Sequence, residues 1–471
     1  MKTIIVWFRN DLRLHDHPAL VTACENAERV IPVFILNDAI LHGRHGSPNR
    51  NRFLVESLQD LKISLQSKGS DLVVRYGDPV KELQLLIAQT GAEAVYYTAD
   101  YTPYAIKRDK IVKTELRAIS TEFRGFAGRL IVSSFDGLQT KAGTPHKVFT
   151  PFYNNWLKLD RRPLAVLPNQ LKPLPKDLAI GVMPGIKSAS TKESLSPDVL
   201  LGGETAARKQ FDHFVEDSID NYQAASNDLA ADGTSRLSSY LHFGCLSSRE
   251  IETLLPDTTG AQAWRRQLAW REFYNYILFQ FPTNATEEFQ QRFRKLNWGA
   301  DKALLAAWQQ GQTGYPIVDA GMRQLLAQGW MHNRARLIVG SFLTKDLWID
   351  WRLGEAHFMH LLIDGDEASN NGNWQWISSV GVDPAPVFRR LYNPALQQTR
   401  HDPSGVYVRR FVPELKDVPD KYLAEPSTMP RDIQIASNCI IGQDYPAPII
   451  DHKQARLDAL THFREASLPR G

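Results

Sequence analysis

The most unusual stretch of the chain runs from Asp364 to Trp376 and reads DGDEASNNGNWQW. Acidic, amide and glycine residues are bracketed there by an apolar helical pattern and two tryptophans, so several polar groups would be drawn into a largely buried setting. Buried polar groups must find partners. A second stretch, Trp330 to Arg336 (WMHNRAR), is the other strong candidate for chemistry. Taken by themselves, these residues fit a capped helix end with a satisfied Asp–Arg pair as well as they fit a ligand site.

The segment from Gly233 to Ser238 (GTSRLS) is suited to binding phosphate oxygens. It places three hydroxyls and several backbone N–H groups where a helix would begin, and helix starts attract anions. Ser and Thr are also ordinary N-cap residues, so the motif alone favours a plain helix cap. Phosphate binding gains support only together with the two stretches above.

Tryptophan is concentrated in one part of the chain. Large aromatic side chains usually supply buried area, so an aromatic core is the first interpretation. A cluster this dense also suits stacking on flat rings or relaying electrons, and composition does not choose between these uses. Nine of the 11 tryptophans fall in one stretch: Trp264, Trp270, Trp298, Trp308, Trp330, Trp348, Trp351, Trp374 and Trp376.

Composition and charge exclude several classes of protein. The 471 residues are 43% apolar and 23% charged, which is typical of a globular chain of two or three domains and argues against disorder. Lys and Arg total 55 against 52 Asp and Glu, so the net charge is only +3. Any surface that binds nucleic acid must therefore be a local one.

The cysteines and the N-terminal run indicate the compartment. Cys24, Cys245 and Cys439 share no metal-ligand or redox spacing, which argues against a disulfide framework and a metal site and fits a reducing compartment. The first apolar run, Ile4 to Phe8, is too short for a signal peptide, and no later stretch could span a bilayer. We therefore expect a cytoplasmic protein without a membrane segment.

Five short β-branched and aromatic runs in the first third of the chain are typical of buried strands. Segments with helical spacing lie between them, such as 53–61 and 83–87. This alternation predicts a parallel sheet covered on both faces. No G-x-G-x-x-G motif follows the first run, so the usual dinucleotide fingerprint is missing. The five predicted strands are Ile4–Phe8, Val30–Leu36, Leu72–Tyr76, Ala94–Thr98 and Leu130–Val132.

The second half of the chain has a different pattern. A segment rich in Pro, Lys and Ser, from about Pro163 to Gly203, is typical of an extended linker. Beyond it almost every pattern is helical, as in 206–222, 261–281, 302–310 and 317–328. We expect an α/β domain over residues 1–132, a linker over 133–203 and an all-α domain over 204–471.

Across essentially its whole length the sequence resembles the photolyase/cryptochrome flavoprotein family, and most of all its bacterial class I type members that act on cyclobutane pyrimidine dimers in DNA. The resemblance implies a Rossmann-like, parallel α/β domain that binds an antenna, followed by a helical domain that binds FAD. Besides the three polar segments above, it rests on the motifs VWFRNDLR from Val6, KVFTPF from Lys147, WREF from Trp270, TGYPIVD from Thr313 and YPAPI from Tyr445.

The resemblance also implies how FAD is held. Asn370 stands where an amide faces the flavin N5 atom, and because an amide does not donate a proton as an acid does, it favours a fully reduced, anionic flavin. That preference indicates a repair enzyme. Arg336 and Asp364 resemble the buried ion pair beside the ring. The diphosphate and ribityl set comprises Tyr222, Thr234, Ser235, Arg236, Leu237 and Ser238, and the ring set comprises Asn333, Arg336, Asp364, Asp366 and Asn370.

Trp374, Trp351 and Trp298 coincide with the tryptophan relay of the family, which passes electrons from the surface to photoexcited oxidised flavin. Indole suits this task because its large π-system can be oxidised briefly without breaking bonds.

On the DNA side, the resemblance implies that a pyrimidine dimer flips out of the duplex and packs against Trp270 and Trp376. The reduced flavin would split it under blue or near-UV light. Gln267 and Arg271 belong to the same substrate-binding set, and Arg334, with Arg389 or Arg390, would meet the DNA backbone.

Three lesion-side residues depart from the usual dimer-photolyase pattern. Gln267 replaces a Glu, Leu337 stands where Met is common, and Ser226 stands where some members have a phosphate-binding Arg. Gln also occurs at the first position in (6-4) photolyases and animal cryptochromes. The (6-4) enzymes, however, carry two histidines where this chain has Asn333 and Leu337. Dimer repair is the first expectation, a cryptochrome-like blue-light photoreceptor is the alternative, and (6-4) repair is the least favoured.

A second, light-harvesting chromophore is common in the family. Asp100 and Tyr104 lie in a segment that resembles members with a deazaflavin or flavin antenna, which favours 8-hydroxy-5-deazaflavin or FMN over methenyltetrahydrofolate. His242, however, sits where deazaflavin binders often have Lys. The long tail of many family photoreceptors is absent after the helical segment 451–466, which favours repair. We expect a monomer that associates with damaged DNA.

Overall fold

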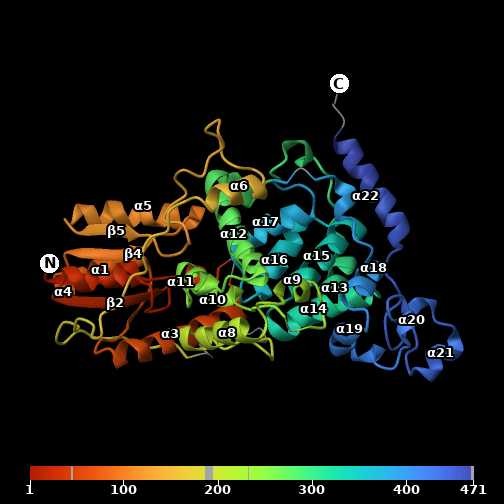
Figure 1. The fold of residues 1–471 in the computed structure, drawn as a ribbon, viewed down its shortest axis with the longest axis horizontal. Helices are drawn as coiled ribbons and strands as arrows, with labels where there is room; N and C mark the ends of the chain where they lie inside the picture. The colour runs from red at the N-terminus through yellow and green to blue at the C-terminus, as the bar shows by residue number, and fades with distance from the viewer. Residues whose placement is uncertain (44–45, 186–194, 232, 384, 468–471) are drawn as a thin grey trace.

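The computed structural model describes residues 1–43, 46–185, 195–231, 233–383 and 385–467. Figure 1 shows the sheet and its helices at the N-terminal end of the molecule and a larger group of helices at the other end. Residues 186–194 of the predicted linker, and residues 468–471 of the predicted helical domain, lie outside the described residues.

A five-stranded parallel sheet organises the N-terminal part. Its strand order is β3-β2-β1-β4-β5, and every pair of neighbours is parallel. This is the doubly wound arrangement that the alternating sequence pattern predicts. The strands are β1 (Thr3–Phe8), β2 (Arg29–Leu36), β3 (Val73–Tyr76), β4 (Ala94–Thr98) and β5 (Glu122–Phe126).

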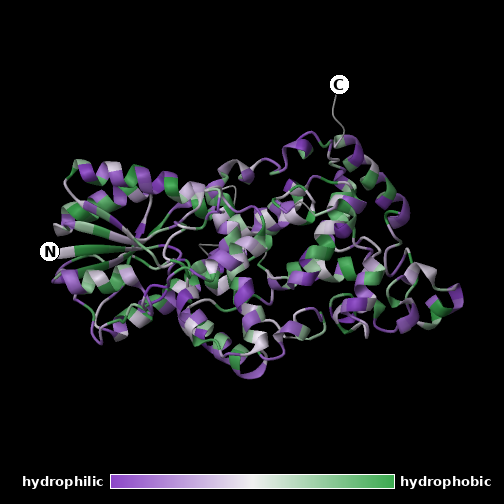
Figure 2. Cartoon of the chain, turned by 45° about the horizontal axis from the view of Figure 1, so that its top comes forward, coloured by the Kyte–Doolittle hydropathy of each residue, from purple (hydrophilic) through white to green (hydrophobic). Residues whose placement is uncertain are grey.

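Helices cover both faces of the sheet. α1 (Pro18–Asn26) and α3 (Pro48–Ser67) pack on one face, and α4 (Pro79–Thr90) and α5 (Pro103–Ala118) pack on the other. Each of the four begins with proline at its first position, where the missing N–H costs nothing. Figure 2 shows mostly hydrophobic strands enclosed by helices of mixed hydropathy. The short helix α2 (Asp38–Leu41) follows β2.

The fifth predicted strand is wrong. Leu130, Ile131 and Val132 are almost fully buried but form no strand, and β5 lies earlier, at Glu122–Phe126. The backbone N–H of Ile131 donates to the Glu272 carboxylate of the helical domain instead of to a neighbouring strand. β5 is an edge strand with mostly exposed side chains, so its apolar signal is weak.

The helical prediction for the second half is confirmed over the described residues, which form no named strand after β5. Helix α13 (Lys302–Gln310) coincides with its prediction, and the predicted helix 206–222 is two helices. These two are α8 (Glu204–Asp217) and α9 (Tyr222–Ala225).

The other helical segments of this part of the chain are α10 (Ser238–Phe243), α11 (Ser248–Leu254), α12 (Thr259–Gln280), η1 (Pro282–Ala285), η2 (Gln291–Phe293), α14 (Pro316–Gln328), α15 (Asn333–Ser341), the π-helical turn η3 (Phe342–Asp346), α16 (Trp351–Leu361), α17 (Glu367–Ile377), η4 (Val387–Arg390), α18 (Pro394–His401), α19 (Val406–Phe411), η5 (Pro413–Leu415), α20 (Asp420–Leu423), η6 (Pro426–Thr428), α21 (Arg431–Ala436) and α22 (His452–Ala466).

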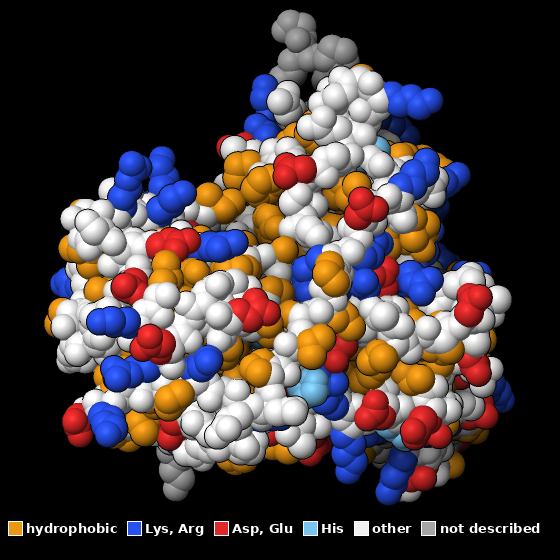
Figure 3. All heavy atoms as spheres, turned by 60° about the vertical axis from the view of Figure 1, so that its left-hand side comes forward, with side chains coloured by type: hydrophobic (Ala, Val, Ile, Leu, Met, Phe, Trp, Pro, Cys, Tyr) orange, Lys and Arg blue, Asp and Glu red, His pale blue; other side chains and the backbone are white. Residues whose placement is uncertain are grey.

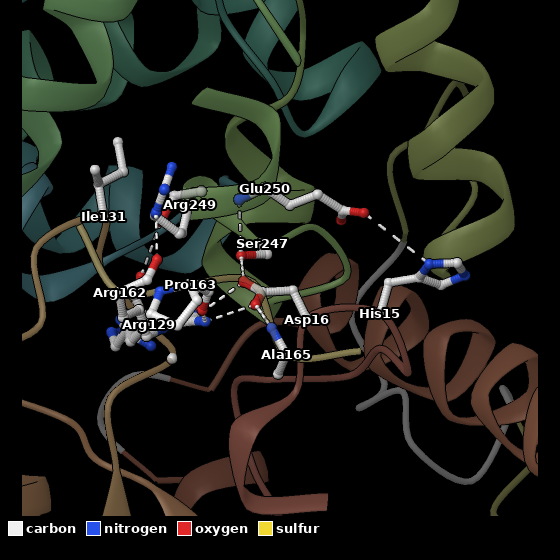
Figure 4. Close-up of polar contacts among 12 residues, drawn as sticks. His15, Asp16, Arg129, Ile131, Arg162, Pro163, Ala165, Ser247, Arg249 and Glu250 are labelled. Carbon is white, nitrogen blue, oxygen red and sulfur yellow. Dashed lines mark hydrogen bonds and ion pairs between the residues drawn. The ribbon is translucent and has the colours of Figure 1, made fainter. Parts of the chain in front are cut away.

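The segment between the two parts is anchored to both. Within it α6 (Phe149–Trp156) forms a helix that packs on α12. Farther along, both terminal nitrogens of the Arg162 guanidinium donate to the Asp16 carboxylate at 2.6 Å, and the N–H of Ala165 donates to it at 2.9 Å. Ser247, just before α11, donates to the same carboxylate (Figure 4). One buried acidic group thus joins the sheet domain, the connecting segment and the helical domain.

Glu272 joins the two parts from the helical side. Its carboxylate is fully buried and accepts hydrogen bonds from the indole Nε1 of Trp156, at 2.7 Å, and from the backbone N–H of Ile131. Burial raises the pKa of this carboxyl to about 6, and the hydrogen bonds oppose that effect. The apolar cluster around it contains side chains from both parts of the chain.

The described residues form no helix long and apolar enough to cross a membrane, and they hold no group of acidic, His and Cys side chains that could bind a metal ion. The three cysteines are unpaired and buried. Figure 3 shows Lys and Arg side chains interspersed with Asp and Glu on the face that it draws, in keeping with the balanced composition.

Replacing Glu272 tests this connection. Glu272→Ala leaves the Trp156 indole and the Ile131 amide without their acceptor, so we expect a loss of about 3 kcal/mol in the free energy of unfolding, and a smaller loss for Glu272→Gln. Urea unfolding followed by circular dichroism measures both. Glu122→Ala, on the exposed edge strand, is the control. An Ala variant within about 0.5 kcal/mol of the parent protein would contradict the assignment.

Candidate functional site

A cavity of about 550 Å³ opens in the helical domain. Its walls come from α9, α10, α12, α15 and α17, which lie together in Figure 1. It unites the three polar segments that the sequence singled out. The predicted residues that line it are Tyr222, Thr234, Ser235, Arg236, Leu237, Ser238, Gln267, Trp270, Arg271, Asn333, Arg334, Arg336, Asp364, Asp366, Asn370, Trp374 and Trp376.

The predicted phosphate-binding segment forms one wall. It leads into α10, which begins at Ser238 as expected but has only six residues, so hydroxyls and loop N–H groups carry any affinity for phosphate. Arg236 has a left-handed backbone conformation, with φ of 53°, and its guanidinium lies 4.8 Å from the centre of the Trp330 ring. Burial raises the pKa of Tyr222, on the same wall, to about 12, so its hydroxyl stays protonated.

The predicted ion pair is present. Arg336 Nη2 donates to Asp364 Oδ2 at 2.8 Å, and Arg336 Nε donates to the carbonyl oxygen of Met331 at 2.8 Å. The other carboxylate oxygen, Asp364 Oδ1, is buried and accepts no hydrogen bond from the described residues. A buried acceptor without a donor calls for a ligand with an N–H group, and the flavin ring carries one. The donor set therefore fits FAD.

Asp366 caps α17 and lies in a charged cluster. Its carboxylate accepts from the backbone N–H of Ser369 at 2.9 Å and from Arg129 Nη2 at 3.1 Å. The His242 ring nitrogen lies 3.8 Å away, beyond hydrogen-bonding distance. Burial alone would raise the pKa of Asp366, but His242 and Arg129 hold it far below its usual range. Asp366 is therefore a permanent anion at the cavity wall.

Asn370 has a defined orientation. Its side-chain N–H donates to the backbone oxygen of Glu355 at 3.0 Å. Asn370 lines the cavity, and its amide oxygen, which does not take part in this contact, can only accept hydrogen bonds. No acid stands at this position to supply a proton.

The lesion-side residues form an aromatic wall. The Trp270 ring stacks on Phe149 with 3.7 Å between ring centres, and the Trp376 indole donates to Asp383 at 3.2 Å. Gln267 is exposed at the cavity, and Arg271 is held in its wall by the backbone oxygens of Leu241 and Arg129.

The two arginines of η4 have different environments. Arg390 is buried, lies 4.0 Å from the centre of the Trp376 ring and pairs with Asp383 at 2.6 Å, so it faces the protein interior. Arg389 is exposed and is the one of the two that DNA could reach. Arg334, at the cavity, donates to the side chain of Asn227.

The three predicted relay tryptophans run from the cavity outward. Trp374 lines the cavity and packs 5.0 Å from Phe358 of α16. Trp351 begins α16 and is fully buried, whereas Trp298 is half-buried and lies outside the cavity wall. A fourth indole, Trp348, lies 4.7 Å from Trp298 between ring centres.

Several groups at the site escaped the sequence analysis. Tyr274 of α12 lines the cavity and donates to Asn373, and Glu288 accepts from two of the predicted relay tryptophans. Helical periodicity marks Tyr274 only as a core residue, and no pattern marks Glu288. These contacts arise from tertiary packing alone.

Asp100 and Tyr104, the predicted antenna residues, lie at the carboxyl end of the sheet and outside the cavity. Asp100 follows β4 and pairs with Arg129 at 3.5 Å. Tyr104 is 48% exposed at the start of α5, and the Arg108 guanidinium lies 5.6 Å from its ring centre. Ligands of open parallel sheets commonly bind at this edge.

Two protein-family models match the chain. The model for DNA photolyase matches residues 4–174, and the model for the FAD binding domain of DNA photolyase matches residues 264–465. Among curated proteins, the deoxyribodipyrimidine photo-lyase of Alkalihalophilus pseudofirmus is 39% identical, and the alignment covers 98% of this chain and 97% of that protein.

Solved structures agree over the whole length. A bacterial class III photolyase from Agrobacterium tumefaciens has a TM-score of 0.92 and 37% identity, with 99% of this chain and 98% of that chain covered. A cryptochrome from Synechocystis has a TM-score of 0.90 and 30% identity, covering 98% and 99%. An archaeal photolyase from Sulfolobus tokodaii with two FAD molecules has a TM-score of 0.83 and 29% identity, covering 98% and 100%. The chain therefore belongs to the DNA photolyase family, the flavoprotein family of photolyases and cryptochromes.

Proposed function

We propose that this protein is a light-dependent DNA repair enzyme that splits cyclobutane pyrimidine dimers by electron transfer from photoexcited reduced FAD. One observation carries the proposal: a single cavity joins the polar groups that suit a flavin to the aromatic wall that suits a flipped-out base. The full-length similarity to a deoxyribodipyrimidine photo-lyase supports the same substrate.

The cavity residues bind and orient FAD. Asp364, held in place by Arg336, would accept a hydrogen bond from the ring N–H, and the segment Thr234 to Ser238 would hold the diphosphate. With its N–H engaged by Glu355, Asn370 would offer its oxygen as an acceptor and supply no proton, which favours the reduced, anionic ring. When bound, reduced FAD supplies one electron on absorbing light and takes it back after the cyclobutane ring has opened.

The lesion side receives the flipped-out dimer. Trp270 and Trp376 offer flat faces, and the amide of Gln267 offers both a donor and an acceptor to the base carbonyl edges. Arg271 contributes positive charge from the wall, and Arg334 and the exposed Arg389 contact phosphates around the opening. The relay Trp374, Trp351 and Trp298 recharges the flavin when it has become oxidised.

A cryptochrome-like photoreceptor is the second candidate, favoured by the close structural match to the Synechocystis cryptochrome. Repair of (6-4) lesions has less support. Asn333 and Leu337 line the cavity in place of the two histidines, and His242 is the one histidine among the described residues of its wall.

Two finer proposals concern the setting of the enzyme. Three buried, unpaired cysteines suit a reducing compartment, so we place the protein in the cytoplasm, associated with DNA. A flipped-out dimer needs only the one cavity of one chain, so the working unit is a monomer.

The first test is dimer repair itself. Photoreduced protein is mixed with an oligonucleotide that carries one thymine dimer, and restored bases are measured under blue light and in darkness. We expect restoration in light only. Gln267→Ala removes a hydrogen-bonding group, so the affinity for dimer-containing DNA should fall about tenfold while the affinity for undamaged DNA is unchanged. Bound FAD and intact photoreduction without restoration would exclude dimer repair; (6-4) lesions and signalling partners would then be tested.

The second test concerns the relay. Trp374→Phe removes the innermost oxidisable indole, so photoreduction by an external thiol should slow at least about tenfold while FAD stays bound. Absorbance near the flavin band follows the reduction. Trp308→Phe is the matched control, because Trp308 is fully buried and lies 6.2 Å from Trp374 but outside the proposed relay. Unchanged photoreduction in Trp374→Phe would refute the relay role.

The third test concerns the antenna. We propose that the sheet edge at Asp100 and Tyr104 binds 8-hydroxy-5-deazaflavin or FMN, more readily than methenyltetrahydrofolate. The protein is reconstituted with each compound, and energy transfer to FAD is measured by fluorescence. Tyr104→Ala should weaken binding of the preferred compound roughly tenfold. Failure of both flavin compounds to bind, even after reconstitution, would count against this antenna site.

A further inference from the structure

We infer that Glu288 gives the tryptophan relay its outward direction, because its carboxylate makes Trp351 and Trp298 easier to oxidise than Trp374. The inference rests on the proposed relay and assigns a positioning and tuning role to a residue outside the cavity.

The geometry is that of one acceptor shared by two indoles. Glu288 Oε1 accepts the Nε1–H of Trp298 at 3.3 Å and that of Trp351 at 3.3 Å. The side chain is buried, and its other oxygen, Oε2, accepts from Arg352 at 2.8 Å. The backbone oxygen of Glu288 accepts from Arg294 Nε at 3.0 Å, so the residue is fixed at both ends.

The other indoles nearby have no such partner. The buried Nε1–H of Trp374 finds no acceptor among the described residues. Trp348 donates to the neutral backbone oxygen of Asn297 at 2.9 Å. A carboxylate stabilises a positive charge on the ring whose N–H it accepts more than a neutral oxygen or no acceptor does. The two indoles that share Glu288 are therefore easier to oxidise than Trp374, the indole beside the flavin site.

The positive charge of Arg352 is shared between two carboxylates. Arg352 pairs with Glu288 at 2.8 Å and with Asp350 at 3.2 Å, so one guanidinium faces two carboxylates. The same guanidinium lies 4.6 Å from the centre of the Trp351 ring and opposes the oxidation of that indole. Arg294 pairs separately with Glu287 at 2.8 Å.

Glu288 is charged at neutral pH. Burial would raise the pKa of Glu288, but the hydrogen bonds that it accepts and the charge of Arg352 together outweigh burial and lower the pKa. A carboxylate with a lowered pKa is a weak base, so it stabilises an oxidised indole without removing the N–H proton.

The electron steps balance along the chain. Trp374 gives one electron to the photoexcited oxidised flavin and regains one from Trp351, which in turn regains one from Trp298. The half-buried Trp298 is left one electron short, and an external thiol reductant supplies that electron. Glu288 stabilises the last two of these oxidised indoles, which favours forward transfer over recombination.

The experiment removes the negative charge of Glu288 and keeps the shape of its side chain. Glu288→Gln is prepared with FAD bound, and transient absorption records the yield of long-lived oxidised tryptophan after a light flash. We expect the yield to fall roughly fivefold, since a hydrogen bond to a charged acceptor is about twice as strong as one to a neutral acceptor. Ultraviolet resonance Raman spectra, which report indole N–H hydrogen bonding without any photochemistry, should show weaker bonding at two indoles. Glu287→Gln, at the neighbouring exposed carboxylate, should match the parent protein in both.

A second variant separates charge from structure. Arg352→Met breaks the same ion pair but removes a positive charge. Measured at alkaline pH, where Glu288 stays ionised without Arg352, the yield of long-lived oxidised tryptophan should rise. If breaking the ion pair only disturbs the local structure, the yield will fall in both variants, and that result would overturn the inference. An unchanged yield in Glu288→Gln would overturn it as well. If Glu288→Gln does not fold, Arg352→Met alone tests the inference. A yield of oxidised tryptophan in Arg352→Met that is equal to or lower than that of the parent protein would then overturn the inference. The experiment uses no DNA, so its outcome does not depend on whether the protein repairs dimers. Unchanged photoreduction in Trp374→Phe would show separately that the relay itself is absent.

Discussion

A buried guanidinium, that of Arg129, holds the two halves of the molecule in register. It pairs with Asp100 at the edge of the sheet at 3.5 Å and with Asp366 at the start of α17 at 3.1 Å. Without Arg129, the buried Asp366 and the half-buried Asp100 would both lose this counter-charge, and removing one partner of a buried ion pair is strongly destabilising. Because α17 carries Asn370 and Trp374, the position of the cavity wall depends on this contact.

Much of the fold follows from sequence patterns whose side chains are buried on a regular period. Four of the five strands and helices such as α13 were predictable in this way, because both faces of the sheet and one face of each helix are apolar. β5 was not, because an edge strand with exposed side chains has no such pattern. The apolar run 130–132 was wrongly predicted to be a strand. Its side chains are buried by the contact between the two halves, and Glu272 accepts a backbone hydrogen bond there.

The candidate site, like the fold, was predictable only in part. The composition of three segments marked them as unusual, and the family resemblance supplied the roles that we expect for residues such as Asp364 and Asn370. What the sequence could not predict are contacts between residues far apart in the chain. Arg390 looks like a surface cation in the sequence, yet it lies under Trp376 because Asp383 is there to receive it. Glu288 acquires its partners only when α16 is in place.

The position of Trp298, the outermost station of the proposed relay, would have a consequence for turnover. Trp298 is half-buried and does not belong to the wall of the cavity that would receive DNA. On the proposed relay, a reductant would reach the protein without entering the substrate opening. Recharging and substrate binding would then use separate entrances, so an oxidised enzyme that already covers a lesion would be restored in place.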